Sequence, residues 1–539
     1  MEVHSIIAKA LTDHGVDTMF GLIGDGNLFM VDDYVRQRGM TFIPVATEAS
    51  ALPMANGYSS ISGKVGVATV THGPGFTNTV TSLVEGVRGR APLLLVTGDT
   101  AVVDRDNFQN VVQRRFADAA GAGFEQLRAP HTAAEDVAVA LRRAVLERRP
   151  IVLNVPVEFQ WEDADYVPVA APPVPQLQRP DPDALDRALG IIASARRPLV
   201  LAGRGAASPR ARDSLLRLAE RIGAPVATTL RGRNLFAGDP FNLGVFGTLA
   251  SPVATDVILE TDCVIAFGAG LNKYTTASGS LVNGKAVVHC DLDPVVLGSF
   301  TRVDAPIVGD AATVADSMVE LLDVGDTAPS PFRSDQLAAR ISASPTLEFD
   351  DRSTSHTIDV RTALARLDEV VPRNRIVVSD VGRFLLHEWT LVNPPNPWSY
   401  VQPVNFGSVG LGMANAIGAA HADPSRPVLL ITGDGGFALG GLVEFSSAVR
   451  DRIDLIVVVC NDGSYGAEHA LFRARGMDPS LSLLSLPDLA PIAKALGGDG
   501  VTVTNLDDLQ SASNAIENRD RPLLIDVKLD PDHIPWPGL

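Results

Sequence analysis

Short, continuous runs of Val, Ile and Leu recur along the chain between alanine-rich segments of helical periodicity. Runs without polar alternation predict strands buried on both faces, as in a parallel sheet covered by helices. Because such strands alternate with helices over the whole length, the pattern predicts several doubly wound α/β units. The runs lie at 65–71, 92–98, 150–156, 198–203, 262–268, 286–294, 375–382, 427–435, 454–462 and 522–530.

Two stretches interrupt this alternation and predict linkers. Residues 166–184 are rich in proline, and residues 323–359 are rich in Ser, Asp, Thr and Pro and lack strand runs. The predicted fold is therefore α/β, with three doubly wound, mostly parallel-sheet domains at 1–165, 185–322 and 360–539.

The first and third domains resemble each other in sequence. Residues 91–100 are similar to 426–435, and residues 149–158 are similar to 521–530. This similarity favours duplication of one α/β unit, whose two copies would face one ligand from two sides.

Composition narrows the functional class. The 539 residues carry a net charge of −18, which argues against nucleic acid as a partner, although backbone N–H groups at glycine-rich turns can still bind phosphate. No apolar run approaches a membrane span, and the N-terminus lacks the features of a signal peptide. The three cysteines are far apart in apolar runs and are typical of reduced thiols, so we expect a cytoplasmic protein.

The sharpest local pattern lies at the ends of two consecutive predicted strands. One strand ends in Gly-Asp-Gly-Gly at 433–436, and the next ends in Asn-Asp-Gly at 461–463. Open α/β sheets bind ligands at such strand ends. The oxygens of Asp434 and Asn461 suit Mg²⁺ or Ca²⁺, and the glycines allow a diphosphate to approach the backbone. Either fragment alone would be interpreted as a plain turn; the pair predicts a site.

The pair resembles the thiamine-diphosphate motif, with Asp462 where asparagine is usual. The resemblance implies that Asp434, Asn461 and the carbonyl of Gly463 bind Mg²⁺ and that the metal bridges the diphosphate. The implied cofactor-contacting residues of this segment are Gly433, Asp434, Gly435, Gly436, Asn461 and Gly463.

The segments 20–35 and 45–78 resemble the pyrimidine-binding domain of the acetolactate synthase and pyruvate decarboxylase superfamily. The resemblance makes Glu48 the carboxyl that faces the aminopyrimidine and promotes removal of the cofactor's C2 proton. A glutamate that complements a helix N-terminus is the alternative interpretation.

The third domain resembles the diphosphate-binding domain of the same superfamily. Residues 406–420 match the segment in which Gly407 would bind the aminopyrimidine and Val409 would hold the cofactor's rings in a bent form; ordinary packing is the alternative for Val409. Residues 378–384 resemble a diphosphate-contacting turn with Gly382 and Arg383, although Arg383 would equally serve as a surface cation.

The residues expected near the substrate are mixed in type. Asp25 and Glu468 resemble the carboxyls of pyruvate and indolepyruvate decarboxylases, whereas Phe108-Gln109 resembles acetolactate synthases. His72 is the best histidine candidate for acid–base work, with a structural hydrogen bond as its alternative; His469 is weaker. The predicted catalytic residues are Glu48, Glu468, Asp25, His72 and Gln109.

The central domain resembles the Rossmann-like domain of this superfamily, in which some members bind FAD; Gly-Arg-Gly-Ala at 203–206 is too loose a pattern to favour FAD here. The resemblance implies a thiamine-diphosphate- and Mg²⁺-dependent lyase or carboligase. It would decarboxylate a small 2-oxo acid without oxidation, or act on a related acyloin, through an enamine that is protonated or transferred to a second carbonyl. The alternatives are an FAD-dependent oxidase and a non-catalytic homologue that acts as a binding module. A homodimer or homotetramer with inter-subunit active sites is also implied, and the substrate stays open.

Overall fold

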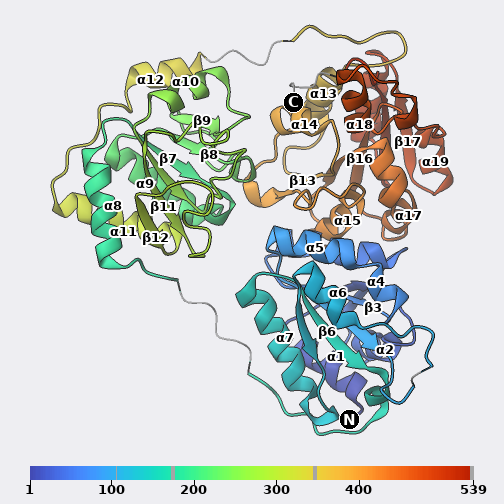
Figure 1. Cartoon of the computed structure of the whole chain (residues 1–539). Helices are drawn as coiled ribbons and strands as arrows, with labels where there is room; N and C mark the ends of the chain where they lie inside the picture. The colour runs from blue at the N-terminus through green and yellow to red at the C-terminus, as the bar shows by residue number, and fades with distance from the viewer. Residues whose placement is uncertain (105, 171–176, 344–348, 535–539) are drawn as a thin grey trace. The chain divides into compact units, whose positions relative to one another are not determined.

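The computed structural model describes residues 1–104, 106–170, 177–343 and 349–534. They form three six-stranded sheets flanked by helices (Figure 1), which confirms the predicted α/β class and the three domains. Adjacent strands run parallel in each sheet, as the buried Val, Ile and Leu runs predict.

The N-terminal sheet has the strand order β2-β1-β3-β4-β6-β5. Its strands are β1 (Thr18–Gly21), β2 (Thr41–Pro44), β3 (Gly66–Val70), β4 (Leu93–Asp99), β5 (Gly123–Gln126) and β6 (Ile151–Pro156). Its helices are α1 (Val3–Asp13), α2 (Leu28–Arg36), α3 (Ala51–Ser62), α4 (Pro74–Thr77), α5 (Val80–Gly89), α6 (Gln113–Ala120) and α7 (Ala133–Glu147).

The central sheet has the order β12-β11-β10-β7-β8-β9. Its strands are β7 (Pro198–Ala202), β8 (Val226–Thr228), β9 (Asn242–Val245), β10 (Cys263–Phe267), β11 (Ala286–Asp291) and β12 (Ala305–Val308). Its helices are α8 (Pro182–Ser194), α9 (Pro209–Ile222), α10 (Pro252–Glu260), α11 (Ala311–Val324) and α12 (Asp335–Ser342).

The C-terminal sheet has the order β14-β13-β15-β16-β18-β17. Its strands are β13 (Ile376–Ser379), β14 (Tyr400–Val401), β15 (Val428–Gly433), β16 (Leu455–Asn461), β17 (Asp499–Val503) and β18 (Leu523–Lys528). Its helices are α13 (Val360–Val370), α14 (Leu385–Leu391), α15 (Gly412–Ala422), α16 (Asp434–Gly436), a π-helix (Phe437–Gly441), α17 (Leu442–Arg450), α18 (Gly466–Ala474), α19 (Leu489–Ala495) and α20 (Asp508–Glu517).

The N-terminal and C-terminal sheets share one topology, since adding twelve to each strand number of the first gives the order of the second. This identity supports the predicted duplication. The similarity of 149–158 to 521–530 joins the equivalent strands β6 and β18. The similarity of 91–100 to 426–435 does not join equivalent strands, because it joins β4 to β15, whereas the equivalent of β4 is β16. Apolar strands resemble one another too closely for such a similarity to identify equivalent strands.

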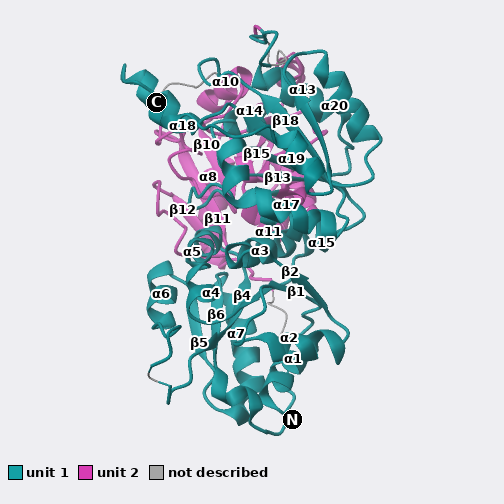
Figure 2. Ribbon diagram, turned by 90° about the vertical axis from the view of Figure 1, so that its right-hand side faces the viewer, with its two compact units in different colours: residues 1–173, 351–392, 401–539 teal, residues 174–350, 393–400 magenta. Residues whose placement is uncertain are grey.

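The chain divides into two compact units, which Figure 2 distinguishes by colour. Unit 1 comprises Met1–Pro173, Asp351–Val392 and Val401–Leu539, and unit 2 comprises Val174–Asp350 and Asn393–Tyr400.

Parts of both predicted linkers, 171–176 and 344–348, lie outside the described residues. The rest of the second linker is not simply irregular, because it contains α12, whose Leu337 is buried in the core of unit 2. The helix begins after Ser334, whose side chain accepts a hydrogen bond from the backbone N–H of Leu337.

Within unit 1, α3 and α15 pack against each other and join the cores of the N-terminal and C-terminal domains. Glycines make this close approach possible. A Cβ added at Gly57 would lie 2.0 Å from the carbonyl oxygen of Asn415, and one added at Gly418 would lie 1.8 Å from that of Met54. The Asn56 side-chain amide also donates to Asn415 Oδ1 at 2.7 Å.

Candidate functional site

Asp434 and Asn461 lie at the carboxyl ends of neighbouring strands. β15 ends at Gly433 and β16 at Asn461, and the two strands pair in parallel register up to Gly433 opposite Cys460. Asp434 opens the short helix α16, and a π-helix follows at Phe437–Gly441. A π-helical turn in this position is typical of functional sites.

The Asp434 carboxylate suits a cation. Asp434 is 2% exposed, and its Oδ2 has no hydrogen-bond partner in the described part of the chain. Burial raises the pKa of this carboxyl to about 7, and the nearby Asp462 carboxylate adds to the rise. A buried carboxylate with a free oxygen is stabilised by a bound metal ion, whose positive charge offsets the cost of burial and lowers the pKa again.

The Asn461 amide is oriented by its neighbours. Its Nδ2 donates to Asp526 Oδ1 at 2.7 Å, and its Oδ1 accepts from the backbone N–H of Gly463 at 3.2 Å. Gly463 has a φ of +63°, which favours glycine. The donor set of Asp434, Asn461 and the Gly463 carbonyl therefore fits Mg²⁺, with Asp526 holding a ligand in place.

Two buried aspartates that the sequence reasoning missed organise this site. Asp526, in the middle of β18, is fully buried and also accepts from the backbone N–H of Leu489. Asp380, directly after β13, accepts from the Thr432 hydroxyl at 3.0 Å and from the Gly410 N–H at 3.1 Å, and burial raises its pKa to about 6. A charged residue within an apolar strand run was the signal available for Asp526.

The Gly407–Gly410 loop follows β14 and precedes α15. Gly407 and Gly410 have φ values of +79° and +86°. Gly407 is exposed and Val409 is partly exposed, so both are accessible to a ligand. Their predicted roles stay predictions; the structure adds that Asp380 fixes the end of the loop through Gly410.

Gly382 and Arg383 lie in the turn after β13, and the Arg383 guanidinium contacts the end of the chain. It donates to the carbonyls of Pro531 at 2.7 Å and Ile534 at 2.6 Å. Burial lowers its pKa, while the Asp462 carboxylate opposes that shift. Arg383 is 9% exposed and therefore is not a surface cation.

In the N-terminal domain, Glu48 opens a short helical turn directly after Thr47. Its Oε2 accepts a hydrogen bond from Asn78 Nδ2 at 3.1 Å. A Cβ added at Gly75 would lie 3.7 Å from its Oε1. The structure thus brings Glu48 to the 72–78 turn; Asn78 is its partner, which the sequence reasoning did not single out.

Asp25 and His72 lie close together around Thr71. The Thr71 hydroxyl donates to Asp25 Oδ1 at 2.7 Å, and His72 Nδ1 lies 3.9 Å from the same oxygen. His72 is 2% exposed, and its Nε2 has no hydrogen-bond partner among the described residues. A buried imidazole nitrogen without a partner indicates a place for a ligand atom or water.

Gln109 lies beside the same turn, with both its backbone and its Cβ close to Gly73. Its carbonyl oxygen lies 2.3 Å from the position of a Cβ on Gly73, whose φ is +61°. The buried glutamine of this region is Gln113, whose Oε1 accepts from the Gly73 N–H at 3.0 Å and whose Nε2 donates to the Gly98 carbonyl at 2.9 Å. The catalytic role of Gln109 stays a prediction, and Gln113 was missed.

Glu468 is exposed on the first turn of α18, directly after the Asn461–Gly463 turn. His469 points the other way and is 2% exposed; its Nδ1 lies 3.2 Å from Ser482 Oγ and its Nε2 2.9 Å from Asp532 Oδ1. His469 is therefore a structural residue in this arrangement, and Glu468 is the accessible one.

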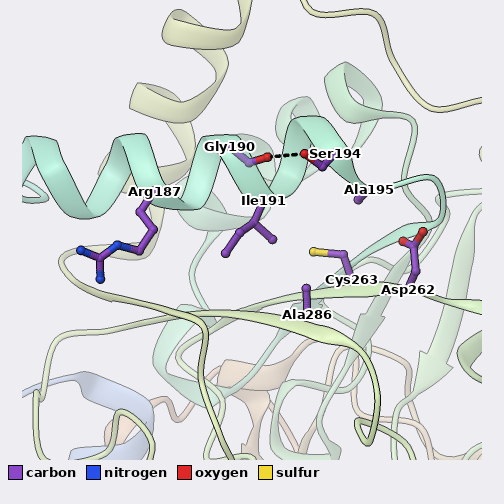
Figure 3. A pocket seen from close by; sticks show the side chains of 8 residues that line it. All are labelled: Arg187, Gly190, Ile191, Ser194, Ala195, Asp262, Cys263 and Ala286. Carbon is purple, nitrogen blue, oxygen red and sulfur yellow. Dashed lines mark hydrogen bonds between the residues drawn. The ribbon is translucent and has the colours of Figure 1, made fainter.

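A cavity of about 500 Å³ lies in the central domain against α8 (Figure 3). Cys263 and Ala286, the first residues of β10 and β11, are among its lining residues. It therefore lies at the amino end of the sheet, whereas dinucleotides bind at the carboxyl end. At that end, the loop after β7 contacts the loop after β10, with the Gly205 N–H donating to the Gly268 carbonyl at 3.0 Å.

Two features are absent from the described residues. No helix there is long and apolar enough to cross a membrane. No group of three or more His, Cys, Asp or Glu side chains there could bind a metal ion. The predicted metal site is of another kind, since it combines one carboxylate with an amide and a carbonyl oxygen.

Comparison with known proteins identifies the class of all three domains. Three thiamine pyrophosphate enzyme models match: the N-terminal TPP binding domain at residues 1–121, the central domain at 185–318 and the C-terminal TPP binding domain at 380–527. The chain belongs to the thiamine pyrophosphate enzyme family.

Curated relatives extend the match over nearly the whole chain. A sulfoacetaldehyde acetyltransferase of Rhodobacter capsulatus is 30% identical over 95% of this chain and 91% of its own length. An acetolactate synthase large subunit of Parasynechococcus marenigrum is 30% identical over 97% and 86%. A probable acetolactate synthase large subunit of Methanococcus aeolicus is 27% identical over 97% and 91%. The chain is therefore an acetolactate-synthase-like member of the family.

Proposed function

We propose that the chain is a thiamine-diphosphate- and Mg²⁺-dependent lyase or carboligase that acts on a small 2-oxo acid or a related acyloin. When bound, thiamine diphosphate would supply a carbon nucleophile for a substrate carbonyl and a sink for the electrons of the neighbouring C–C bond. The observation that carries the proposal is the Asp434 carboxylate, buried with one free oxygen beside an Asn461 amide held by Asp526.

The chain's own residues divide the work. Asp434, Asn461 and the Gly463 carbonyl bind the metal, and Gly433, Gly435, Gly436, Gly382 and Gly407 bring backbone close to the cofactor. Arg383 acts through the C-terminal segment, whose carbonyls it binds. Val409 contacts the rings, and Glu48 moves the proton that activates the cofactor.

On the substrate side, Asp25 and His72 exchange protons with the bound carbonyl compound. Thr71 connects the two, because its hydroxyl donates to Asp25 and lies 3.5 Å from His72 Nδ1. Glu468 and Gln109 complete this group. The names of the relatives, acetolactate synthase and sulfoacetaldehyde acetyltransferase, support transfer to a second carbonyl or to another acceptor over protonation as the fate of the fragment left after C–C cleavage.

The proposal includes a homodimer or homotetramer with active sites between subunits. Within one chain, the hydrogen bonds of Glu48 stay in the N-terminal domain and those of Asn461 in the C-terminal domain. Large apolar side chains of both domains are exposed, as in Phe108 at 94% and Leu439 at 71%. Burial of such side chains is what a second copy would provide.

The test combines cofactor binding with a substrate panel. Thiamine diphosphate with Mg²⁺ should raise the melting temperature, and thiamine diphosphate with a chelator should not. A panel of 2-oxo acids, with and without aldehyde acceptors, is then followed by CO₂ release and product mass. Absence of both the thermal shift and any turnover would identify a non-catalytic homologue.

Bound FAD is not favoured, because the carboxyl-end loops after β7 and β10 contact each other and the cavity lies at the opposite edge of the sheet. The purified protein should therefore lack the visible absorbance of a bound flavin.

A further inference from the structure

The helices α5 and α17 occupy equivalent places in the two domains of unit 1. Each connects the third strand of its domain to the fourth, β3 to β4 and β15 to β16. Each carries a buried glutamate, Glu85 on α5 at 5% exposure and Glu444 on α17 at 1%. A buried carboxylate needs hydrogen-bond donors, and here the donors belong to the other domain.

Glu444 binds the backbone that leads into Glu48. Its Oε1 accepts from the N–H groups of Ala46 at 2.9 Å and Thr47 at 3.3 Å. From the same helix, Arg450 Nη2 donates to the Pro44 carbonyl at 2.8 Å. The C-terminal domain thus holds the residues directly before the predicted catalytic glutamate.

Glu85 binds the backbone that leads into Gly407. Its Oε1 accepts from the Asn405 backbone N–H at 3.1 Å and from Asn405 Nδ2 at 2.5 Å, and its Oε2 accepts from the Phe406 N–H at 2.7 Å. From the same helix, the Arg88 guanidinium lies 4.7 Å from the centre of the Phe406 ring. The N-terminal domain thus holds the residues directly before the predicted aminopyrimidine-binding loop.

We propose that Glu85 and Glu444 are reciprocal positioning residues, each of which fixes the other domain's cofactor-contacting segment. The segments that they bind follow the equivalent strands β2 and β14, so the same arrangement occurs once in each domain. Loss of either carboxylate leaves two backbone N–H groups without their protein acceptor, which loosens the segment. The functional part rests on the proposed roles of Glu48 and Gly407.

The two carboxylates differ in a way that a conservative variant can detect. Both donors to Glu444 reach one oxygen, so the carbonyl of a glutamine can replace it. The donors to Glu85 reach both oxygens, so a glutamine there turns its NH₂ group toward an N–H group. We therefore expect Glu444→Gln to be tolerated and Glu85→Gln to disrupt its segment.

The experiment is hydrogen–deuterium exchange of the full chain without cofactor, on peptides that cover 44–50 and 403–409. Glu444→Ala should speed exchange about tenfold in the first peptide alone, and Glu85→Ala in the second alone. Glu444→Gln should restore protection, whereas Glu85→Gln should not. The exposed Glu220→Gln, on α9 in the central domain, is the matched loss of one negative charge.

A second measurement follows exchange of the C2 proton on bound thiamine diphosphate. Glu444→Ala should slow it about tenfold and Glu444→Gln should restore it. Unchanged protection in both alanine variants, exchange that rises in every peptide, or equal behaviour of the two glutamine variants would overturn the proposal. Since the first measurement uses no cofactor, failure of the proposed function shows separately, as a lack of cofactor binding.

Discussion

The N-terminal and C-terminal domains of unit 1 share one sheet order but place different chemistry at equivalent strand ends. β3 ends before Thr71 and the buried His72, whereas its equivalent β15 ends at Gly433, before the buried Asp434. The proposed function therefore assigns a proton-transfer group to one copy of this scaffold and a cation site to the other. The strands fix where such residues lie, and the residue that follows each strand decides what they do.

The carboxylates of the two domains, Asp25 and Asp434, also differ in their surroundings. Asp25 is exposed and receives a hydrogen bond from Thr71, while Asp434 is buried next to Asp462, and burial raises its pKa to about 7. A carboxylate that exchanges protons with a substrate needs access, and one that binds a metal gains from exclusion of water. The N-terminal domain should thus control chemistry, and the C-terminal domain should control cofactor binding.

The largest effect should come from Glu48→Gln. An amide cannot exchange the proton that activates the cofactor, so turnover should fall about 10³-fold. Cofactor affinity, measured by calorimetry with Mg²⁺ present, should stay within about threefold, because the proposed diphosphate contacts lie in the C-terminal domain and not at Glu48. Glu220→Gln serves as the control. Near-normal turnover would break the assignment of chemistry to the N-terminal domain.

Asp434→Ala should have the opposite profile. Loss of the proposed metal ligand should weaken Mg²⁺-dependent cofactor binding at least about 100-fold, since even neighbours of ligands contribute about 10- to 100-fold. Apo stability should not fall, because the substitution removes a buried carboxylate that has a free oxygen. If calorimetry gave parental affinity, the cation site would have to lie elsewhere.

Gly418→Ala tests the contact that joins the two domains. The new methyl group would meet the Met54 carbonyl, so the free energy of unfolding of the apo protein should fall by about 1–3 kcal/mol. The matched control is Gly190→Ala on α8, where nothing lies within 4 Å and stability should rise by about 0.5–1 kcal/mol. Urea unfolding measures the stability of both variants. If Gly418→Ala were no less stable than Gly190→Ala, the close approach of α3 and α15 would not be needed for stability.

The smallest effect is expected for Asp532→Asn near the C-terminus. Arg473 and then His469 donate to this carboxylate and lower its pKa from 3.8 to about 2. A lowered pKa stabilises the fold above pH 3.8 and loses that effect as the pH falls toward 2. The variant should melt at most about 2 °C lower at pH 5–8. A difference in melting temperature between variant and parent that grew below pH 4 would contradict the predicted pH dependence.

The sequence was most informative where strands are long and buried. β15, β16 and β18 fall inside the predicted runs, and β4 extends one residue beyond its run, because burial on both faces demands uninterrupted Val, Ile and Leu. Short strands such as β2 and β14 lack such a run and were not predicted. The boundaries at 165, 185, 322 and 360 stay predictions, and α12 shows that low strand content does not exclude packed structure.

The sequence by itself determined the α/β class, the family and the Gly-Asp-Gly and Asn-Asp-Gly pair, because these depend on local composition and spacing. Only the tertiary structure decided which side chains support them. Asp526, Asp380, Gln113, Glu85 and Glu444 are far in sequence from the groups they hold. A buried carboxylate finds donors wherever the chain brings backbone N–H groups, and that depends on how sheets and helices pack rather than on neighbouring letters.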